Sequence, residues 1–194
     1  VERHGRPLRD DGQPCSPDFV VVGYGKLGGI ELGHNSDLDL VFLHDAASGG
    51  NTDGDKPVSN EQFYARLGQR IVHILSTRTM SGQLYEVDTR LRPSGSAGLL
   101  VSSMESFRKY QLQDAWTWEH QALVRARVVA GCNRARQRFE TIRNEVLCRD
   151  RDPQTLRDDV LAMRDKMVDH LASNKAGRFH LKQDPGGIVD IEFM

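Results

Sequence analysis

The chain has 194 residues, a length that suits one domain of moderate size or a small catalytic domain with part of a second. It carries 26 basic and 27 acidic residues, and this balance argues against a general nucleic-acid binder that uses a basic surface. No apolar run approaches transmembrane length, no signal-peptide region opens the chain, and three distant cysteines provide neither a disulfide framework nor a zinc site. We therefore expect a cytoplasmic protein with neither nucleic acid nor membrane as its partner.

Two apolar runs near the start of the chain flank a glycine-rich turn. Residues 1–18 are polar, contain several prolines and are expected to form a connecting segment. Residues 19–23 predict a first strand, and residues 37–43 predict a second strand whose apolar side chains are buried. Between these strands the chain passes through the turn Gly23-Tyr-Gly-Lys-Leu-Gly28.

The second predicted strand begins with two acids. A carboxylate such as Asp37 or Asp39 is a costly choice at the start of a strand whose other residues are buried. Side chains alternate along a strand, so the two acids point to the same side, roughly 7 Å apart along the backbone. Their mutual repulsion favours a shared cation, and hard oxygen ligands favour Mg²⁺. Together with the glycines and Lys26, the acids indicate a site for the phosphates of a nucleotide.

Three other interpretations of this stretch were weighed. The turn satisfies the G-x-G-x-x-G pattern of a dinucleotide-binding fold, and Asp45 ends the next apolar run, but the segment 29–36 is short and glycine-rich for a crossover helix. A Walker phosphate-binding loop is excluded because Leu27, not Ser or Thr, follows Lys26. The simplest alternative is a turn followed by a solvated strand end, which explains one acid more easily than two.

The next predicted elements add charged side chains to this region. Residues 46–57 are rich in Gly, Asp and Ser and predict an exposed loop, and the capping box Ser59-x-x-Gln62 then opens an amphipathic helix over 60–78. Residues 84–91 alternate as a strand whose polar face consists of Glu86, Asp88, Arg90 and Arg92. We interpret this charged face as part of the site. For the two arginines, a surface salt-bridge network with Glu86 is the alternative.

The rest of the chain is predicted to be mostly helical. After a turn over 93–98 we expect a helix opened by the capping box Ser102-x-x-Glu105 and a helix over 116–129. A helix over 134–147 and a helix after the N-cap Asp152 follow. The chain then continues with a strand over 179–182 and a helix from Asp190. Trp116 and Trp118 are interpreted as packing residues, and the apolar stripe of the helix after Asp152 as ordinary helix packing.

Several of these motifs occur together in one known family. A glycine-rich turn, a short helix and Asp-x-Asp on a strand form the pattern of polymerase-β-type nucleotidyltransferases. The longer string Gly-Tyr-Gly-Lys-Leu-Gly-Gly-x-Glu-Leu-x-x-x-Ser-Asp-Leu-Asp-Leu closely resembles the glutamine-synthetase adenylyltransferase family, whose bifunctional members add AMP to glutamine synthetase and remove it. The segments 84–95, 115–129 and 183–193 agree with that family in the same order. The resemblance covers residues 19–194, and the chain resembles one of the family's two catalytic halves, cut at both ends.

The resemblance implies a fold and a set of site residues. The fold is α+β and polymerase-β-like, with a small mixed sheet and flanking helices as a catalytic core over 19–132 and a helical extension over 133–194. Asp88 joins the two acids of the second strand as a third carboxylate, and these three acids hold two Mg²⁺ ions. The expected nucleotide-binding residues are Gly25, Lys26 and Ser36 for the triphosphate, with Arg90 and Arg92 to balance phosphate charge.

The resemblance also implies a reaction. AMP would pass from ATP to a tyrosine hydroxyl of glutamine synthetase, with pyrophosphate as the leaving group, and the surrounding segments favour the C-terminal, adding half of the family. The alternatives are the half that removes AMP by phosphorolysis, a nucleotidyltransferase with RNA or a small molecule as acceptor, and a binding module without catalysis. The presence of all three acids argues against the last. Control by glutamine and by the PII signalling protein is expected of the full-length bacterial enzyme, through sites that can lie outside this chain.

Overall fold

The structure is a computed structural model, and it describes residues 3–34, 36–80, 82–83, 85–171 and 179–192. Its strands are β1 (Phe19–Gly23), β2 (Leu38–His44), β3 (Val87–Asp88), β4 (Val101–Ser103) and β5 (Arg127–Gly131). Its helices are α1 (Gly25–Gly28), α2 (Asn60–Ser76), α3 (Met104–Gln113), α4 (Thr117–Val124), α5 (Asn133–Leu147), α6 (Pro153–Leu171) and α7 (Ile188–Glu192), with a 3₁₀ turn at η1 (Gly95–Ala97). None of the helices in these described ranges is long and apolar enough to cross a membrane.

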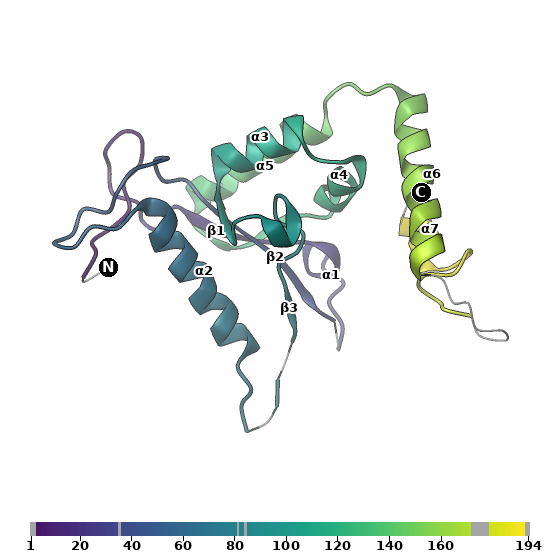
Figure 1. Cartoon of the computed structure of the whole chain (residues 1–194), viewed down its shortest axis with the longest axis horizontal. Helices are drawn as coiled ribbons and strands as arrows, with labels where there is room; N and C mark the ends of the chain where they lie inside the picture. Colours follow the sequence, from purple (N-terminus) through teal and green to yellow (C-terminus); the bar gives the residue numbers. More distant parts are fainter. Residues whose placement is uncertain (1–2, 35, 81, 84, 172–178, 193–194) are drawn as a thin grey trace.

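A small mixed sheet forms the centre of the molecule (Figure 1). β2 pairs with β1 in the antiparallel sense, and β5 pairs antiparallel with the other edge of β1. β3 and β4 both pair with β2 in the parallel sense, β3 at its beginning and β4 at its end. The strand order is β3-β2-β1-β5, with β4 beside β2. The predicted α+β class, with a small mixed sheet and flanking helices, is therefore confirmed.

Helix α2 covers one face of the sheet. Its Tyr64 is fully buried among Leu40 and Phe42 of β2 and Phe19 of β1. The Tyr64 ring also stacks on the imidazole of His44, with 4.4 Å between the ring centroids. Because both faces of β2 are covered, its apolar residues form a continuous run rather than an alternating pattern.

Helices α3, α4 and α5 cover the opposite face. Their buried side chains, which include Phe107, Leu123 and Phe139, form one core with Val41 and Leu43 of β2. Since successive side chains of a strand point to opposite faces, Asp39 lies on the same face of β2 as Val41 and Leu43. The helix predicted over 134–147 is confirmed as α5. The sheet thus directs this acid toward the α3–α5 side of the molecule.

Two predicted helix caps are present, and one is displaced by a residue. Ser59 Oγ accepts a hydrogen bond from the backbone N–H of Gln62 at 3.1 Å and begins α2. Asp152 Oδ2 accepts one from Thr155 N at 2.8 Å and begins α6. The cap of α3 is Ser103 rather than the predicted Ser102, because Ser102 pairs in β4 and is buried.

The helix predicted over 116–129 is too long. Helix α4 ends at Val124, and residues 127–131 instead form β5 along the free edge of β1. Val128 is buried in the core, and Arg127 Nε donates to the carbonyl of Gly28 at 3.1 Å. Pairing with β1 satisfies backbone groups that this edge would otherwise leave open, and this tertiary contact overrides the helical preference of the segment.

The strand predicted over 84–91 is much shorter than expected, and residue 84 lies outside the described residues. Only Val87 and Asp88 pair with β2, because Asp88 Oδ1 accepts a hydrogen bond from the backbone N–H of Arg90 at 2.8 Å. This side-chain bond to the backbone two residues further on forms a turn and ends the strand. The predicted turn over 93–98 follows, and it contains η1.

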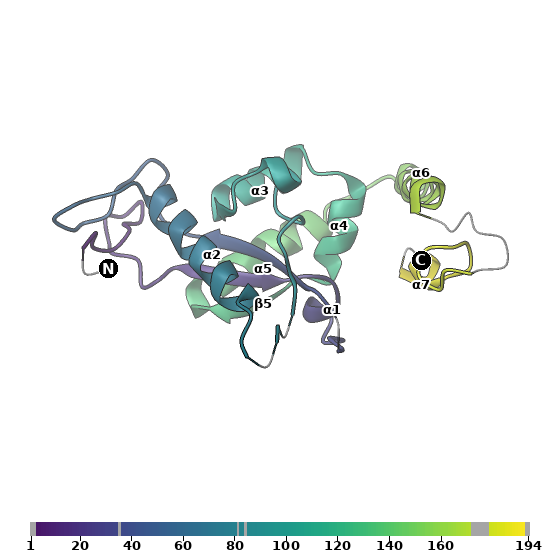
Figure 2. The ribbon, with the colours of Figure 1, turned by 60° about the horizontal axis from the view of Figure 1, so that its bottom comes forward.

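The last helices stand apart from the sheet. Figures 1 and 2 show α6 and α7 side by side beyond α4, joined to α5 by an extended connection. The strand predicted over 179–182 is absent from the described residues 179–182, which lead into a turn in which Asp184 N donates to the His180 carbonyl at 3.0 Å. Helix α7 begins at Ile188, two residues before the predicted start.

Candidate functional site

Asp37, Asp39 and Asp88 lie at one end of the sheet, where β2 and β3 begin their pairing. Asp39 is directly opposite Asp88 in the parallel register, and Leu38 is opposite Val87. Asp37 precedes β2 and is exposed, whereas Asp39 and Asp88 are half-buried. A pocket of about 340 Å³ has Asp37, Asp88 and Arg90 in its wall. The structure therefore brings the three predicted acids to one edge.

Gly25 connects the glycine-rich turn to these acids. Its φ is +51°, in the left-handed region that favours glycine. A Cβ built on Gly25 would lie only 2.6 Å from Asp39 Oδ2, so the carboxylate rests against the bare backbone of the turn. The backbone N–H of Tyr24 donates to the carbonyl oxygen of Asp39 at 2.9 Å and holds the turn beside β2.

The electrostatics of the three acids differ. Burial raises the pKa of Asp39, and the charges of Asp88 and Asp37 raise it further, which shows that all three carboxylates act on one another. The hydrogen bonds that Arg90 donates to Asp88 lower the pKa of Asp88 despite its partial burial. In this geometry the Asp39 carboxyl therefore loses its proton less readily than the Asp88 carboxyl.

The three carboxylates are the kind of ligand that Mg²⁺ prefers, but their side chains are not arranged around a common ion position. In the part of the chain that the structure describes, no group of three or more His, Cys, Asp or Glu side chains is arranged to hold a metal ion. Asp88 is engaged by Arg90, whose Nε lies 2.9 Å from Oδ2. Carboxylate oxygens are nonetheless the ligands that Mg²⁺ prefers, and the repulsion that raises the pKa of Asp39 would be relieved by a shared cation.

Lys26 and Ser36 differ in their availability. Lys26 lies on α1, and its side chain is exposed. Ser36 is buried, and its Oγ accepts a hydrogen bond from the backbone N–H of Gly33 at 3.3 Å within the turn that precedes β2. Ser36 also lines a pocket of about 710 Å³ together with Asp37 and Glu86. The exposed Lys26 side chain can bind an anion, whereas the Ser36 side chain stabilises the turn that precedes β2.

The two predicted phosphate-binding arginines have different environments. Arg90 pairs with Asp88, while its side chain remains 77% exposed. Arg92 instead donates to carbonyl oxygens of its own loop, with distances of 2.7 Å to Thr89 O, 3.2 Å to Ser96 O and 3.2 Å to Gly98 O. No salt bridge joins either of them to Glu86 within the described residues. Arg90 therefore borders the acids, whereas Arg92 organises the loop that follows β3.

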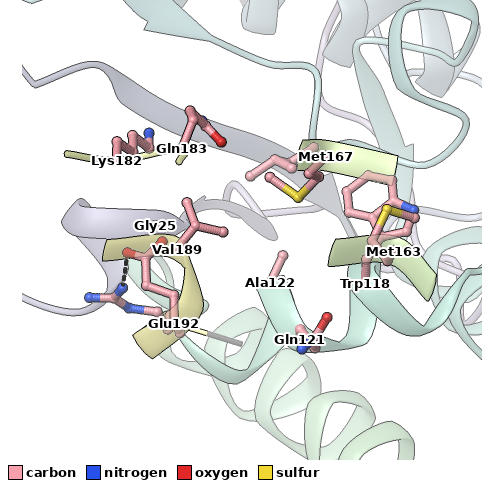
Figure 3. A pocket seen from close by; sticks show the side chains of 12 residues that line it. Gly25, Trp118, Gln121, Ala122, Met163, Met167, Lys182, Gln183, Val189 and Glu192 are labelled. Carbon is pink, nitrogen blue, oxygen red and sulfur yellow. Dashed lines mark hydrogen bonds and ion pairs between the residues drawn. The ribbon is translucent and has the colours of Figure 1, made fainter. Parts of the chain in front are cut away.

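A pocket of about 350 Å³, which we call the Trp118 pocket, lies next to the acids. Figure 3 shows that its wall comes from the Gly25 turn, α4, α6 and the segment before and within α7. Its lining residues are Gly25, Leu91, Trp118, Gln121, Ala122, Arg125, Met163, Met167, Lys182, Gln183, Val189 and Glu192. Gly25 belongs both to this wall and to the contact with Asp39, so the pocket opens beside the acids.

The C-terminal segment contributes to the site through charges. Lys182 is exposed in the pocket wall, and its positive charge opposes the rise in the pKa of Asp39. Arg125 forms ion pairs with Glu31, next to the glycine-rich turn, and with Glu192 of α7, where Nη1 lies 3.2 Å from Oε1. These contacts tie α7 to the core, and the second is drawn as a dashed line in Figure 3.

Sequence analysis did not identify Lys182, Gln121 or Gln183 as site residues. No local pattern marks them, because each reaches the pocket through packing between segments far apart in the chain. The expectation that Trp116 and Trp118 are both packing residues was wrong for Trp116, which is 65% exposed. The apolar stripe of α6 was predicted to pack in the ordinary way, and this prediction fails at two places. Leu156 and Leu171 at its ends are exposed, and Met163 and Met167 line the pocket.

Comparison with known proteins shows similar sequences over the whole chain. A relative from Pseudomonas aeruginosa, a bifunctional glutamine synthetase adenylyltransferase/adenylyl-removing enzyme, is 61% identical over 100% of this chain and 21% of its own length. Enzymes with the same description from Vibrio parahaemolyticus and Thioalkalivibrio sulfidiphilus are 58% and 60% identical, over 100% and 99% of this chain and 20% of their own lengths. The chain thus spans about a fifth of the length of these relatives.

Two further comparisons concern structure and family. A solved toxin–antitoxin structure with AMP-PNP aligns with 79% of this chain and 86% of its own chain, at 15% identity and a TM-score of 0.31. The family model for glutamate-ammonia ligase adenylyltransferase matches residues 1–142. That match covers most of the chain, includes the glycine-rich turn and all three acids, and agrees with the resemblance deduced from the motifs. The chain belongs to the glutamate-ammonia ligase adenylyltransferase family.

Proposed function

We propose that this chain transfers AMP from ATP to a tyrosine hydroxyl of glutamine synthetase and releases pyrophosphate. The observation that carries the proposal is the placement of Asp39 opposite Asp88 and against Gly25, a glycine that also lines the Trp118 pocket. Acids that face one another beside a glycine turn, with Lys26 and Lys182 nearby, form a site for a nucleotide's phosphates and their counter-ion. Family membership supports ATP and glutamine synthetase as the substrates.

Each group of residues would have a distinct task. Asp37, Asp39 and Asp88 would hold the Mg²⁺ that accompanies ATP, and this ion would neutralise charge at the phosphates. The exposed side chains of Lys26, Arg90 and Lys182 would bind the triphosphate and orient its α-phosphorus toward the incoming oxygen. A tyrosine phenol has a pKa near 10, so the site must accept its proton. We assign that task to Asp88, the carboxylate that lies opposite Asp39 in the pairing of β2 with β3.

In the full-length enzyme we expect the reaction to occur in the bacterial cytoplasm and to respond to glutamine and the PII protein. The 194-residue chain offers one catalytic site with which the chemistry can be tested in isolation.

The experiment supplies the chain with unmodified glutamine synthetase, Mg²⁺ and ATP labelled in its α-phosphate. Transfer of label to a tyrosine of glutamine synthetase is the expected result. A second reaction contains AMP-modified glutamine synthetase and inorganic phosphate. Release of ADP in this reaction, without transfer of label in the first, would assign the chain to the adenylyl-removing activity instead. Asp55→Asn, which alters an exposed acid of the loop before α2, is the matched control for variants of the three acids.

A further inference from the structure

We propose that the Trp118 pocket binds the adenine base of ATP and that Gln183 recognises its 6-amino group. This inference rests on the proposed function and extends it, because it assigns the residues that select the nucleotide. The acids and lysines can bind the phosphates of any nucleoside triphosphate. Selection of ATP must therefore come from a surface that contacts the base.

The pocket and the acids are linked through Gly25. Gly25 touches the Asp39 carboxylate on one side and lines the pocket on the other. Lys182 and Gln183 are adjacent in the chain, and both line the pocket, while the charge of Lys182 acts on Asp39. A nucleotide with its phosphates at the acids would therefore have its base beside Gln183. The adjacent residues Lys182 and Gln183 would contact the two ends of the same ligand.

The apolar part of the wall suits a flat aromatic ring. Trp118 of α4, Met163 and Met167 of α6 and Val189 of α7 all line the pocket (Figure 3). Bases stack on aromatic side chains, and polarisable methionine sulfur makes favourable contacts with rings. The pocket volume of about 350 Å³ falls in the range of small-ligand sites. Trp116, two residues earlier, is 65% exposed and does not belong to this wall, so the two tryptophans have different roles.

The polar part of the wall contains two buried acceptors without donors. Gln121 Oε1 and Gln183 Oε1 are both buried and have no hydrogen-bond partner among the described residues. A buried acceptor left unpaired is unfavourable, so such atoms indicate a missing donor. Adenine carries an amino group at position 6, whereas guanine carries a carbonyl oxygen there. Figure 3 shows Gln121 and Gln183 on opposite sides of the pocket, so one base edge meets only one of them. The amide oxygen of Gln183, which follows Lys182, would accept from adenine's amino group and repel guanine's carbonyl oxygen.

The test measures binding rather than transfer. The chain, with Mg²⁺, is titrated with an ATP analogue whose α,β-bridging oxygen is a methylene group, and tryptophan fluorescence is followed. Because the chain has two tryptophans, Trp116→Phe and Trp118→Phe separate their signals. We expect the quenching to persist in Trp116→Phe and to disappear in Trp118→Phe. Quenching that persists unchanged in Trp118→Phe would overturn the placement of the base.

Recognition of the amino group is tested by competition with triphosphates of modified bases. Purine riboside triphosphate lacks the 6-amino group, and inosine triphosphate carries an oxygen there. We expect each to bind about tenfold more weakly than ATP, and we expect Gln183→Met to reduce this ratio. The ratio compares ligands within one variant, so a general loss of affinity does not imitate the effect. If the variant does not fold, the affinity for ATP relative to the two modified triphosphates, measured with the unaltered chain, decides whether the amino group is recognised.

The outcomes separate this inference from the proposed function. Equal binding of ATP and purine riboside triphosphate, or no nucleotide binding at all, would overturn the base assignment. Transfer of AMP to glutamine synthetase together with equal binding would leave the proposed function intact and refute only the pocket. Selective binding of ATP that depends on the Gln183 side chain, without any transfer to glutamine synthetase, would support the base assignment and refute the proposed function.

Discussion

The backbone of Gly25 lies against the carboxylate of Asp39, and a side chain at position 25 would collide with that carboxylate. Gly25 has φ of +51°, and an added Cβ would approach Asp39 Oδ2 to 2.6 Å. The glycine-rich turn and β2 therefore form one structural unit. The turn positions the acid, and the conformation of the turn depends on glycine.

Replacement of Gly25 by alanine should damage activity more than stability. We expect Gly25→Ala to lower the rate of AMP transfer by about 10²-fold, because the added methyl group must displace Asp39 from its place. Gly49→Ala is the matched control, since Gly49 has φ of +69° and nothing within 4 Å of its added Cβ. Both variants should lose about 1–2 kcal/mol of stability from backbone strain. Equal transfer rates for the two variants would contradict the role given to the contact.

Neutralisation of the central acid should abolish transfer without unfolding the chain. Burial and two neighbouring acids raise the pKa of Asp39, so its charge opposes folding at neutral pH. Asp39→Asn should therefore melt at or above the temperature of the unaltered chain while the rate falls at least about 10²-fold, as should the rate of Asp37→Asn. Thermal melts and label transfer measure the two effects, with Asp55→Asn as control. Retention of more than about a tenth of the activity would refute the metal-site assignment.

Arg90 and Arg92 should be separable by mutation. Arg90 lowers the pKa of Asp88, so in Arg90→Ala this pKa rises and the acid limb of the pH–rate profile moves to higher pH. Stability should change little, because the Arg90 side chain is 77% exposed and its ion pair is screened by solvent. Arg92→Ala should instead lose about 2 kcal/mol of stability, since its guanidinium holds three carbonyl groups of its loop. Chemical denaturation and rate profiles of both variants provide the measurements. An unshifted acid limb in Arg90→Ala would show that Arg90 does not set the ionisation of Asp88.

Buried His44 should make the fold sensitive to acid. Burial lowers its pKa from 6.5 to about 4, so between these values the unfolded chain binds a proton that the folded chain excludes. This contribution to stability is complete above pH 6.5 and is lost as the pH falls toward 4, by about 3 kcal/mol in all. Denaturant melts at several pH values should show this slope, and His44→Gln should reduce it. His73→Gln, which alters an exposed residue of α2, should leave it unchanged.

Much of the sheet and of the helices that cover it could be predicted because their signals are local. The first two strands are apolar runs bounded by glycine and acids, and α2, α5 and α6 carry caps or apolar periodicity that the folded chain keeps. Asp37 and Asp39 could be proposed as site residues because two carboxylates next to a run of buried strand residues are unusual, and in the structure Asp39 is half-buried while Asp37 is exposed. Such a conflict between local chemistry and local structure marks a functional site without any knowledge of the partners.

Other features depend on segments that meet only in the folded molecule. Residues 127–131 resemble the end of a helix until the open edge of β1 pairs with them. The ends of β3 and the tasks of Arg90 and Arg92 follow from which hydrogen-bond acceptors stand within reach. Gln121 and Gln183 come to line one pocket only when the C-terminal segment packs beside α4. The sequence by itself determined which residues carry charge and where the central strands run. Tertiary structure decided which charges face one another, because hydrogen bonding and burial depend on the three-dimensional surroundings rather than on spacing along the chain.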